Sequence, residues 1–443
     1  MSRTETIVAP ATGQGGAIAV IRVSGNEAFE VTDKIFRSRR GRVADAEGYT
    51  ILYGSVLDGD QTLDDVLVSV FRAPHSYTGE NSVEISCHAS TYIVRRLVEL
   101  LINAGARAAS AGEFTQRAFV NGKMDLSQAE AVADMIASAS QADHRIALNQ
   151  MRGGFSRDLA ELRAELLKIT SLLELELDFS EEDVEFADRT MMRQLLVQIQ
   201  EKIGSLANSF QLGNALKNGV AVAIVGAPNV GKSTLLNRLL NDDRAMVSDV
   251  AGTTRDVIEE YCTIDGVRFR FMDTAGIRTT DDRLEQMGID RTHNAIERAD
   301  VVVQVSEADG DATPIECSAP VITVLNKCDK SGQPAGQIDA STVLISAKNG
   351  DGVDALRAML RGVVDTERLE SGSTVVSNMR HYSALRAASG AVELALAGVD
   401  SGLTSDMLSE EVREVLFHLG EITGEITTDE TLGNIFANFC IGK

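Results

Sequence analysis

The sequence lacks the features that would place it in a membrane or hold it together with disulfide bonds. Its 443 residues contain no tryptophan and only five cysteines, none in a Cys-x-x-Cys pair. This pattern indicates a reduced compartment, with neither a disulfide framework nor a zinc site. No apolar run approaches the roughly 20 residues that span a bilayer, and residues 1–6 lack the regions of a signal peptide. We therefore expect a cytoplasmic protein with no membrane partner.

Positive charge is also scarce. Lysine and arginine number 42 against 65 aspartates and glutamates, which gives a formal net charge of −23. A surface this acidic repels a polyanion at long range, which disfavours broad nonspecific binding of nucleic acid by the chain alone. Any contact with RNA then requires a local basic patch or a basic partner protein.

Both the length of the chain and the change of pattern along it indicate more than one domain. Up to about residue 120, strands and helices are mixed, and Asp58-Gly59-Asp60 predicts a hairpin between 50–57 and 66–71. From about 125 to 211 the spacing is helical, and proline is absent from 75 to 227. The acidic stretch 178–188 is interpreted as a solvated loop between helices.

From about residue 218 to 362 strands alternate with helices, which is typical of a parallel sheet covered on both faces. The chain then becomes helical again from Asn378 through His418. A helical region that is interrupted and then resumed predicts an α/β domain inserted into a helical domain. The expected domains are 1–120, 121–215 (helical, first part), 216–370 (the α/β insert) and 371–443 (helical, second part).

A phosphate-binding loop follows the first strand of the insert. The apolar run Val220–Val225 leads into Gly226-Ala-Pro-Asn229-Val-Gly231-Lys232-Ser233, and leucines at helical spacing follow. Backbone N–H groups of such a loop converge on phosphate oxygens at the start of a helix, where an anion is favoured. Lys232 is expected to reach the β- and γ-phosphates, and Ser233 to ligate Mg²⁺.

Later strands end in the other parts of a guanine-nucleotide site. Residues 267–272 lead into Asp273-Thr274-Ala275-Gly276, near the magnesium ion and γ-phosphate. The next strand ends in Asn326-Lys327-Cys328-Asp329, where the Asp329 carboxylate can accept hydrogen bonds from guanine N1–H and the 2-amino group. Adenine offers no such pair, so the motif argues against a kinase or ATPase. Ser346-Ala347-Lys348 supplies a backbone contact to the base. These motifs together predict a GTPase.

Water activation does not follow the Ras pattern. Gly252-Thr253-Thr254-Arg255-Asp256 is expected to supply Thr254 to Mg²⁺, the alternative being an ordinary surface turn. Ras-like enzymes place glutamine directly after the Asp-Thr-Ala-Gly motif, but Ile277 stands there. No arginine finger is evident. The replacement must come from elsewhere, and the following stretch offers Arg278, Asp281, Asp282, Arg283 and Glu285.

With these motifs the chain resembles the MnmE (TrmE) family of bacterial and organellar tRNA-modification GTPases over essentially its full length. The resemblance rests on Arg22-Val-Ser-Gly25, Ser76-Tyr-Thr-Gly-Glu80, the stretch from Gly112 to Leu126, the GTPase motifs and Cys440-Ile-Gly-Lys443. It implies an N-terminal α+β domain that dimerises and binds 5-formyltetrahydrofolate or a related folate. It also implies a split helical domain with an inserted P-loop GTPase domain.

The resemblance also implies roles for single residues. Potassium would be bound by Asn229, Ser248, Val250 and Thr253, in place of an arginine finger, while Ser233 and Thr254 hold Mg²⁺. Glu285 matches the glutamate that positions water. The folate would contact Arg22, Glu80, Lys123 and Lys443. The predicted contacts to GTP are Asn229, Val230, Gly231, Lys232, Ser233, Thr234, Ser248, Asp249, Val250, Ala251, Gly252, Thr253, Thr254, Asp273, Thr274, Ala275, Gly276, Asn326, Lys327, Asp329, Ser346, Ala347 and Lys348.

Family members work as homodimers with the FAD-dependent flavoprotein MnmG and add an aminomethyl-type group to C5 of the wobble uridine. In this family Cys440 would be needed for the modification, although by residue type alone a buried inert thiol fits equally well. A basic partner would also explain how so acidic a chain reaches tRNA. Two alternatives stay open: a switch that times ribosome assembly, for which only Arg37–Arg42 offers a basic tract, and a folate-dependent transferase regulated by its GTPase domain.

Overall fold

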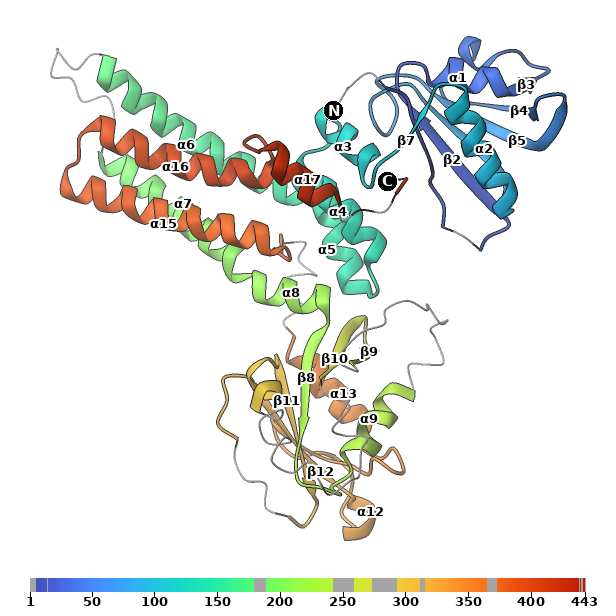
Figure 1. The fold of residues 1–443 in the computed structure, drawn as a ribbon. Helices are drawn as coiled ribbons and strands as arrows, with labels where there is room; N and C mark the ends of the chain where they lie inside the picture. The colour runs from blue at the N-terminus through green and yellow to red at the C-terminus, as the bar shows by residue number, and fades with distance from the viewer. Residues whose placement is uncertain are drawn as a thin grey trace. The chain divides into compact units, whose positions relative to one another are not determined.

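The computed structural model describes residues 5–13, 15–178, 189–241, 259–272, 293–310, 315–364, 373–437, 439, 441 and 442. The chain forms two compact units. The first contains Met1–Ala133 and Gly420–Lys443, and the second contains Asp134–Leu419 (Figure 1). Within the described ranges, no helix is long and apolar enough to cross a membrane.

The first unit is built on a seven-stranded sheet of order β3-β4-β5-β6-β2-β1-β7. All neighbours are antiparallel except β1 and β7. The predicted hairpin is confirmed, although its second strand begins earlier than expected, at Gln61. The strands are β1 Ile7–Pro10, β2 Ile18–Ser24, β3 Phe36–Ser38, β4 Thr50–Asp58, β5 Gln61–Phe71, β6 Ser82–His88 and β7 Arg107–Ala108.

Alternation along the strands gives this sheet one buried face. On β5, Val66, Val68 and Val70 are buried, while Leu67 between them is 46 % exposed. The buried side chains pack against α1 and α2 in one core. The helical segments of the unit are α1 Ala28–Ile35, a short 3₁₀ turn Val43–Asp45, α2 Thr91–Asn103, α3 Glu113–Val120 and α17 Asp429–Ala437, and α4 Leu126–Ala137 runs into the second unit.

The second unit contains the helical region and the insert. Its helical bundle consists of α5 Gln141–Met151, α6 Gly154–Asp178, α7 Arg189–Asn208, α8 Phe210–Asn218, α15 Met379–Ser401 and α16 Ser405–Thr423. The predicted apolar stripe of α6 is confirmed, since Leu159, Leu166 and Leu173 are fully buried. The helical stretch expected from 378 to 418 is divided in two, because Gly402 adopts a left-handed conformation (φ 71°) that ends α15.

The insert is a seven-stranded sheet of order β13-β14-β12-β11-β8-β10-β9. The five inner strands are parallel, as predicted, and the edge strands β9 and β13 are antiparallel. The strands are β8 Val220–Val225, β9 Glu260–Ile264, β10 Val267–Phe271, β11 Val301–Glu307, β12 Val321–Asn326, β13 Gly336–Gln337 and β14 Thr342–Leu344. Its named helices are α9 Lys232–Asn241, α12 Cys328–Ser331 and α13 Val353–Gly362.

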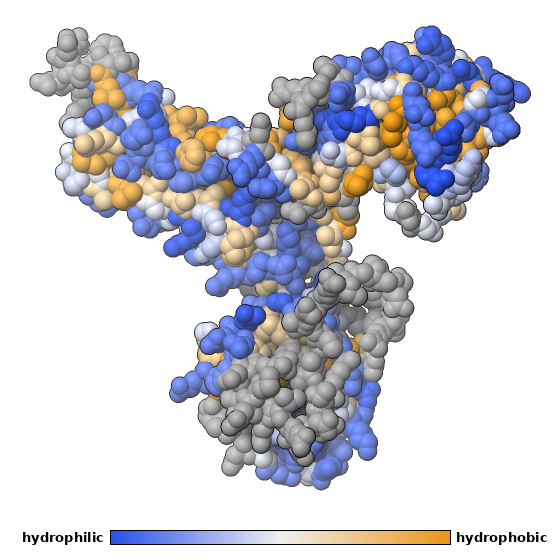
Figure 2. All heavy atoms as spheres, viewed as in Figure 1, coloured by the Kyte–Doolittle hydropathy of each residue, from blue (hydrophilic) through white to orange (hydrophobic). Residues whose placement is uncertain are grey.

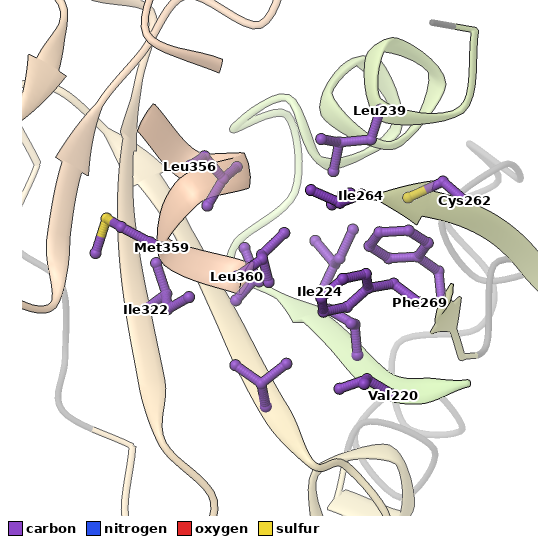
Figure 3. Packing of buried hydrophobic residues seen from close by; sticks show 14 of the residues in the cluster. Val220, Ile224, Leu239, Cys262, Ile264, Phe269, Ile322, Leu356, Met359 and Leu360 are labelled. Carbon is purple, nitrogen blue, oxygen red and sulfur yellow. The ribbon is translucent and has the colours of Figure 1, made fainter. Parts of the chain in front are cut away.

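The core of the insert explains why β8 is apolar throughout. All of its residues are buried, because helices cover both faces of the sheet. On one face Ile224 packs with Leu239 of α9 and Leu360 of α13 (Figure 3). On the other face Ala223 and Val225 meet Ala295 and Ile296, in the helical residues 293–297. The phosphate-binding loop therefore follows a strand that is packed on both of its faces.

A buried carboxylate organises the start of α3 in the first unit. Glu113 is 4 % exposed, and its oxygens accept hydrogen bonds from Arg107 Nη2 (2.6 Å), Arg117 Nη2 (3.0 Å) and the N–H of Ser110 (2.9 Å). Burial alone would raise the pKa of Glu113, but these donors together hold the pKa below its ordinary value. Ionised Glu113 thus stabilises the fold.

Replacing Glu113 with glutamine is expected to lower the free energy of unfolding at neutral pH by about 2 kcal/mol, because the mostly buried Arg117 and the partly exposed Arg107 lose a counter-charge that they share. The folded state depresses the pKa of this carboxyl, so its stabilisation is present above the unfolded pKa and is lost as pH falls through the folded pKa. The difference between wild type and Glu113→Gln should therefore shrink in acid. Denaturant unfolding followed by circular dichroism measures it. Glu99→Gln, at a half-exposed ion pair with Arg96, is the control, and an equal loss in both variants would contradict the prediction.

Candidate nucleotide-binding site

The loop after β8 has a backbone that requires glycine at two points. Gly226 has φ 148°, and a Cβ there would lie 2.1 Å from the carbonyl oxygen of Val305. Gly231 has φ 103°, and a Cβ there would lie 2.2 Å from Nδ2 of Asn326. The loop therefore packs directly onto β11 and β12, and any side chain at these positions would displace it.

Asn326, at the end of β12, joins the parts of the site. It is 3 % exposed. Its Nδ2 donates to the carbonyl oxygen of Val230 (2.8 Å), and its Oδ1 accepts from the N–H of Ala347 (2.9 Å). A second link runs from Lys327 Nζ to the carbonyl oxygen of Asn229 (2.7 Å). The phosphate loop, the Asn326–Asp329 motif and the Ser346–Lys348 loop thus form one hydrogen-bonded assembly.

The Lys232 side chain, which was predicted to reach the β- and γ-phosphates, bonds to the backbone of the phosphate-binding loop. Its Nζ donates to the carbonyl oxygens of Gly226 (2.6 Å) and Ala227 (2.8 Å). Burial lowers the pKa of Lys232, so a phosphate beside it would favour the charged form. Ser233 stands in the first turn of α9, at the positive end of the helix dipole. Mg²⁺ commonly combines one or two protein ligands with substrate phosphates, and the Ser233 hydroxyl suits that role.

The Asp329 carboxylate is held by a neighbouring hydroxyl. Asp329 is exposed, and its Oδ1 accepts a hydrogen bond from Ser346 Oγ (2.7 Å). The Ser346 N–H is in turn bonded to the carbonyl oxygen of Asp351 (2.9 Å). This chain of contacts orients the carboxylate while leaving one oxygen available.

One contributor to this site was missed by the sequence analysis. Arg238 of α9 donates from Nη2 to the carbonyl oxygen of Lys348 (2.6 Å) and from Nε to that of Ala347 (3.4 Å). It therefore holds the loop that was predicted to contact the base. A single arginine in a helix gives no sign of this contact, because its partners lie about 110 residues away in the sequence.

Several predicted residues lie outside the described part of the chain. They include both segments expected to contact the γ-phosphate and Mg²⁺, as well as the acidic stretch after Asp178. One described range ends at Met272, whose N–H donates to the carbonyl oxygen of Val222 in β8. The residues concerned are Ser248, Asp249, Val250, Ala251, Gly252, Thr253, Thr254, Asp273, Thr274, Ala275, Gly276, Glu285, Cys440 and Lys443.

In the first unit, Arg22 of β2 lies in a partly buried setting beside the C-terminal segment. Its Nε and Nη2 donate to Glu84 Oε1 (3.0 and 2.8 Å), and its Nη1 donates to the carbonyl oxygen of Gly442 (3.3 Å). The guanidinium carbon lies 5.2 Å from the ring centroid of Tyr77 and 5.7 Å from that of Phe114. Residues from four separate parts of the sequence therefore meet here.

Glu80 approaches the same face of β2. Ser24, two residues after Arg22, donates from Oγ to Glu80 Oε2 (2.8 Å), and Arg117 Nη1 lies 3.1 Å from the same oxygen. The third predicted folate contact, Lys123, donates from Nζ to the carbonyl oxygen of Pro74 (3.0 Å). The sequence analysis named Arg22, Glu80 and Lys123 but not Glu84 or Arg117, which pair with two of them.

Comparison with known proteins matches the whole chain. The family described as GTP-binding protein TrmE N-terminus matches residues 6–123, and the MnmE helical domain family matches residues 126–440. The protein named tRNA modification GTPase MnmE from Bacteroides fragilis is 50 % identical over 462 aligned residues, covering 99 % of both chains. The protein of the same name from Flavobacterium johnsoniae is 49 % identical over 466 aligned residues, covering 100 % of both.

Among solved structures, the G domain of T. maritima FeoB matches 32 % of this chain and 96 % of its own, with 20 % identity and a TM-score of 0.23. The relatives by sequence show the family of this chain, since about half of all positions are identical along the full length. The chain belongs to the MnmE (TrmE) family of tRNA modification GTPases.

Proposed function

We propose that this chain is a potassium-dependent GTPase of the cytoplasm that works with the FAD-dependent protein MnmG on tRNA. The complex would add an aminomethyl or carboxymethylaminomethyl group to C5 of the wobble uridine, position 34. The observation that supports the nucleotide part most directly is the Asn326 side chain, which bonds the phosphate loop to the Ser346–Lys348 loop. A site built in this way would hold the phosphates and the base of one nucleotide at a fixed separation.

The base is proposed to be guanine. Asp329 is exposed and oriented by Ser346. A carboxylate in this place accepts hydrogen bonds from N1–H and the 2-amino group of guanine, whereas adenine has an acceptor at N1 and would leave the charge unpaired.

Hydrolysis would use residues of the phosphate-binding loop together with residues of the segments that follow it in the sequence. Ser233 and Thr254 would hold Mg²⁺, and Glu285 would orient the attacking water because Ile277 cannot. A potassium ion at Asn229, Ser248, Val250 and Thr253 would neutralise charge that grows between the β- and γ-phosphates. In support, Asn229 has φ 64° and its carbonyl is held by Lys327.

The first unit is proposed to form the homodimer and to bind a folate. The sheet face opposite α1 and α2 exposes Ile51 (57 %), Tyr53 (64 %) and Leu67 (46 %), a row of large apolar side chains that a second copy could cover. Figure 2 shows hydrophobic residues on the surface of this unit, over its strands. For the domain limits we propose 1–120, 121–215, 216–370 and 371–443.

The folate would lie along β2, beside Arg22 and Glu80, with Lys123 and Lys443 at its carboxylates. The C-terminal segment reaches this place. A Cβ on Gly442 would lie 2.0 Å from the carbonyl oxygen of Pro10, and Ile441 pairs with Ala111. Since Cys440 immediately precedes these residues, we propose that its thiol acts near the folate.

The alternative of an RNA-binding switch rests on Arg37–Arg42. In the structure Arg37 donates to the carbonyl oxygen of Phe36 (2.8 Å), and Arg42 lies 3.4 Å from the Asp33 carboxylate. Two of the four arginines of this tract are thus engaged within the chain, and we favour the modifying GTPase.

Replacing Asp329 with asparagine is expected to weaken GTP binding by about 100-fold or more, because a charged acceptor of two hydrogen bonds is lost. The asparagine N–H can instead donate to the 2-carbonyl of xanthine, so binding of xanthosine triphosphate should improve. Competition with a fluorescent guanine nucleotide measures both affinities. Asp354→Asn, at a fully exposed aspartate, is the control. Unchanged preference for GTP in Asp329→Asn would count against the base assignment.

Replacing potassium with sodium at equal ionic strength is expected to slow GTP turnover by about tenfold or more, since the smaller ion fits a carbonyl-lined site poorly. Phosphate release under saturating GTP measures the rate, with GTP affinity determined in both salts as the control. Equal turnover numbers would disprove the potassium mechanism.

Reconstitution with GTP, folate, tRNA and the flavoprotein separates the proposed catalytic roles. Glu285→Ala is expected to reduce GTP hydrolysis by about 10²–10⁴-fold and wobble-uridine modification with it. Cys440→Ser should retain hydrolysis and lose modification. Cys317→Ser, at a half-buried thiol in the insert, is the matched control. Normal modification by both test variants would show that the site assignments are wrong.

A further inference from the structure

We propose that the β9–β10 hairpin carries the nucleotide state of the insert to helix α5, through a contact between its turn and the start of that helix. The inference rests on the GTP cycle proposed above. In sequence, β9 begins at Glu260, shortly after Thr254, and β10 ends at Phe271, just before Asp273. The hairpin therefore joins the two segments proposed to sense the γ-phosphate and Mg²⁺.

The hairpin is built to move as one piece. Its two-residue turn has φ 48° at Asp265 and φ 77° at Gly266, the positive values of a tight type I′ connection. The strands pair without interruption from Val267↔Ile264 to Phe271↔Glu260. β10 also pairs with β8, the strand that ends in the phosphate loop. A displacement at the open end would therefore reach the turn.

The turn supplies part of the N-terminal cap of α5. The carbonyl oxygen of Gly266 accepts a hydrogen bond from the N–H of Ala142 (3.1 Å). N–H groups in the first turn of a helix have no acceptor within the helix. The neighbouring N–H of Asp143 is satisfied by Ser140 Oγ (3.1 Å), so α5 relies on its own serine for one donor and on the hairpin for another.

Apolar packing reinforces this contact. Ala142 and Ile146 lie four residues apart, on one face of α5, and are 8 % and 6 % exposed. They belong to the same buried cluster as Ile264 and Val267, which flank the turn. One face of α5 thus packs into the core of the insert.

The two ends of the insert are connected to the helical region through the peptide chain. The insert begins at Gly219, directly after α8, and the returning segment is held where the N–H of Val376 donates to Ser209 Oγ (3.0 Å). A Cβ on Gly213 would lie 2.2 Å from the Val376 carbonyl oxygen, so this return is close-packed. The hairpin contact is noncovalent, and it can therefore differ between nucleotide states while the two chain connections persist.

The test perturbs the turn while keeping its conformation. Asparagine tolerates a positive φ, but a Cβ at Gly266 would lie 2.9 Å from Gln141 Oε1, so Gly266→Asn disturbs the contact. Adding Gln141→Gly removes both Oε1 and the Gln141 Cβ, which would lie 3.2 Å from the new Cβ, and should restore the contact. Gly59→Asn is the matched control, because Gly59 has φ 63° in a hairpin turn and no atom lies within 4 Å of its Cβ position.

A unique reporter is available because the chain contains no tryptophan. His144→Trp places one on an exposed position of α5, and its emission is compared between GDP and a non-hydrolysable GTP analogue. Gly266→Asn is expected to reduce the nucleotide-dependent difference about fivefold or more, and the added Gln141→Gly to restore it. Gly59→Asn should leave it unchanged. A full difference in Gly266→Asn would overturn the inference.

Amide hydrogen exchange on the unmodified full chain gives an independent measurement. Protection of the Ala142 N–H is expected to differ about tenfold between the two nucleotide states. Equal protection in a chain that binds and hydrolyses GTP would overturn the inference while leaving the proposed function intact. A chain that neither binds nor hydrolyses GTP would instead refute the proposed function.

Discussion

The buried amide of Asn326 is the interaction on which the nucleotide site depends. One side chain donates to Val230 in the phosphate loop and accepts from Ala347 in the loop beyond β14. Because the amide is shielded from water, leaving either group unpaired would cost more than the bond itself contributes. The arrangement also explains Gly231, whose missing Cβ leaves room for Nδ2. Asn326, together with the link from Lys327 to Asn229, therefore sets the separation between the phosphate-binding loop and the Ser346–Lys348 loop.

Charge is organised differently in the first unit. The chain is strongly acidic, and around β2 and α3 its arginines each pair with one or more carboxylates. Arg117 bridges Glu80 and Glu113, and Arg22 pairs with Glu84. Networks of partly buried, bidentate pairs hold side chains more firmly than isolated surface pairs. These charged groups are therefore oriented within the chain itself, and the C-terminal segment contributes the carbonyl oxygen of Gly442, which accepts a hydrogen bond from Arg22.

Much of the fold could be read from local patterns. The strand Val220–Val225, the hairpin at residues 58–60 and the buried stripe of α6 all follow from periodicity and turn residues. The break at Gly402 was missed because one glycine within a long helical stretch is a weak signal. Arg238, Glu84 and Arg117 were missed for another reason. Most of their partners lie far away in the sequence, and a partly buried arginine or glutamate has no periodic signature.

The sequence by itself determined the chemistry of the nucleotide site, because each motif is a short segment whose backbone must follow a strand and precede a helix. It also determined that an α/β insert interrupts a helical region. Tertiary structure decided how these motifs are joined, through Asn326 and Arg238, and that the C-terminal Gly442 reaches Arg22, 420 residues earlier. It also decided that the hairpin turn at Gly266 caps α5. Such contacts depend on the packing of whole elements, and hydrogen bonds between distant segments leave no local pattern in the sequence.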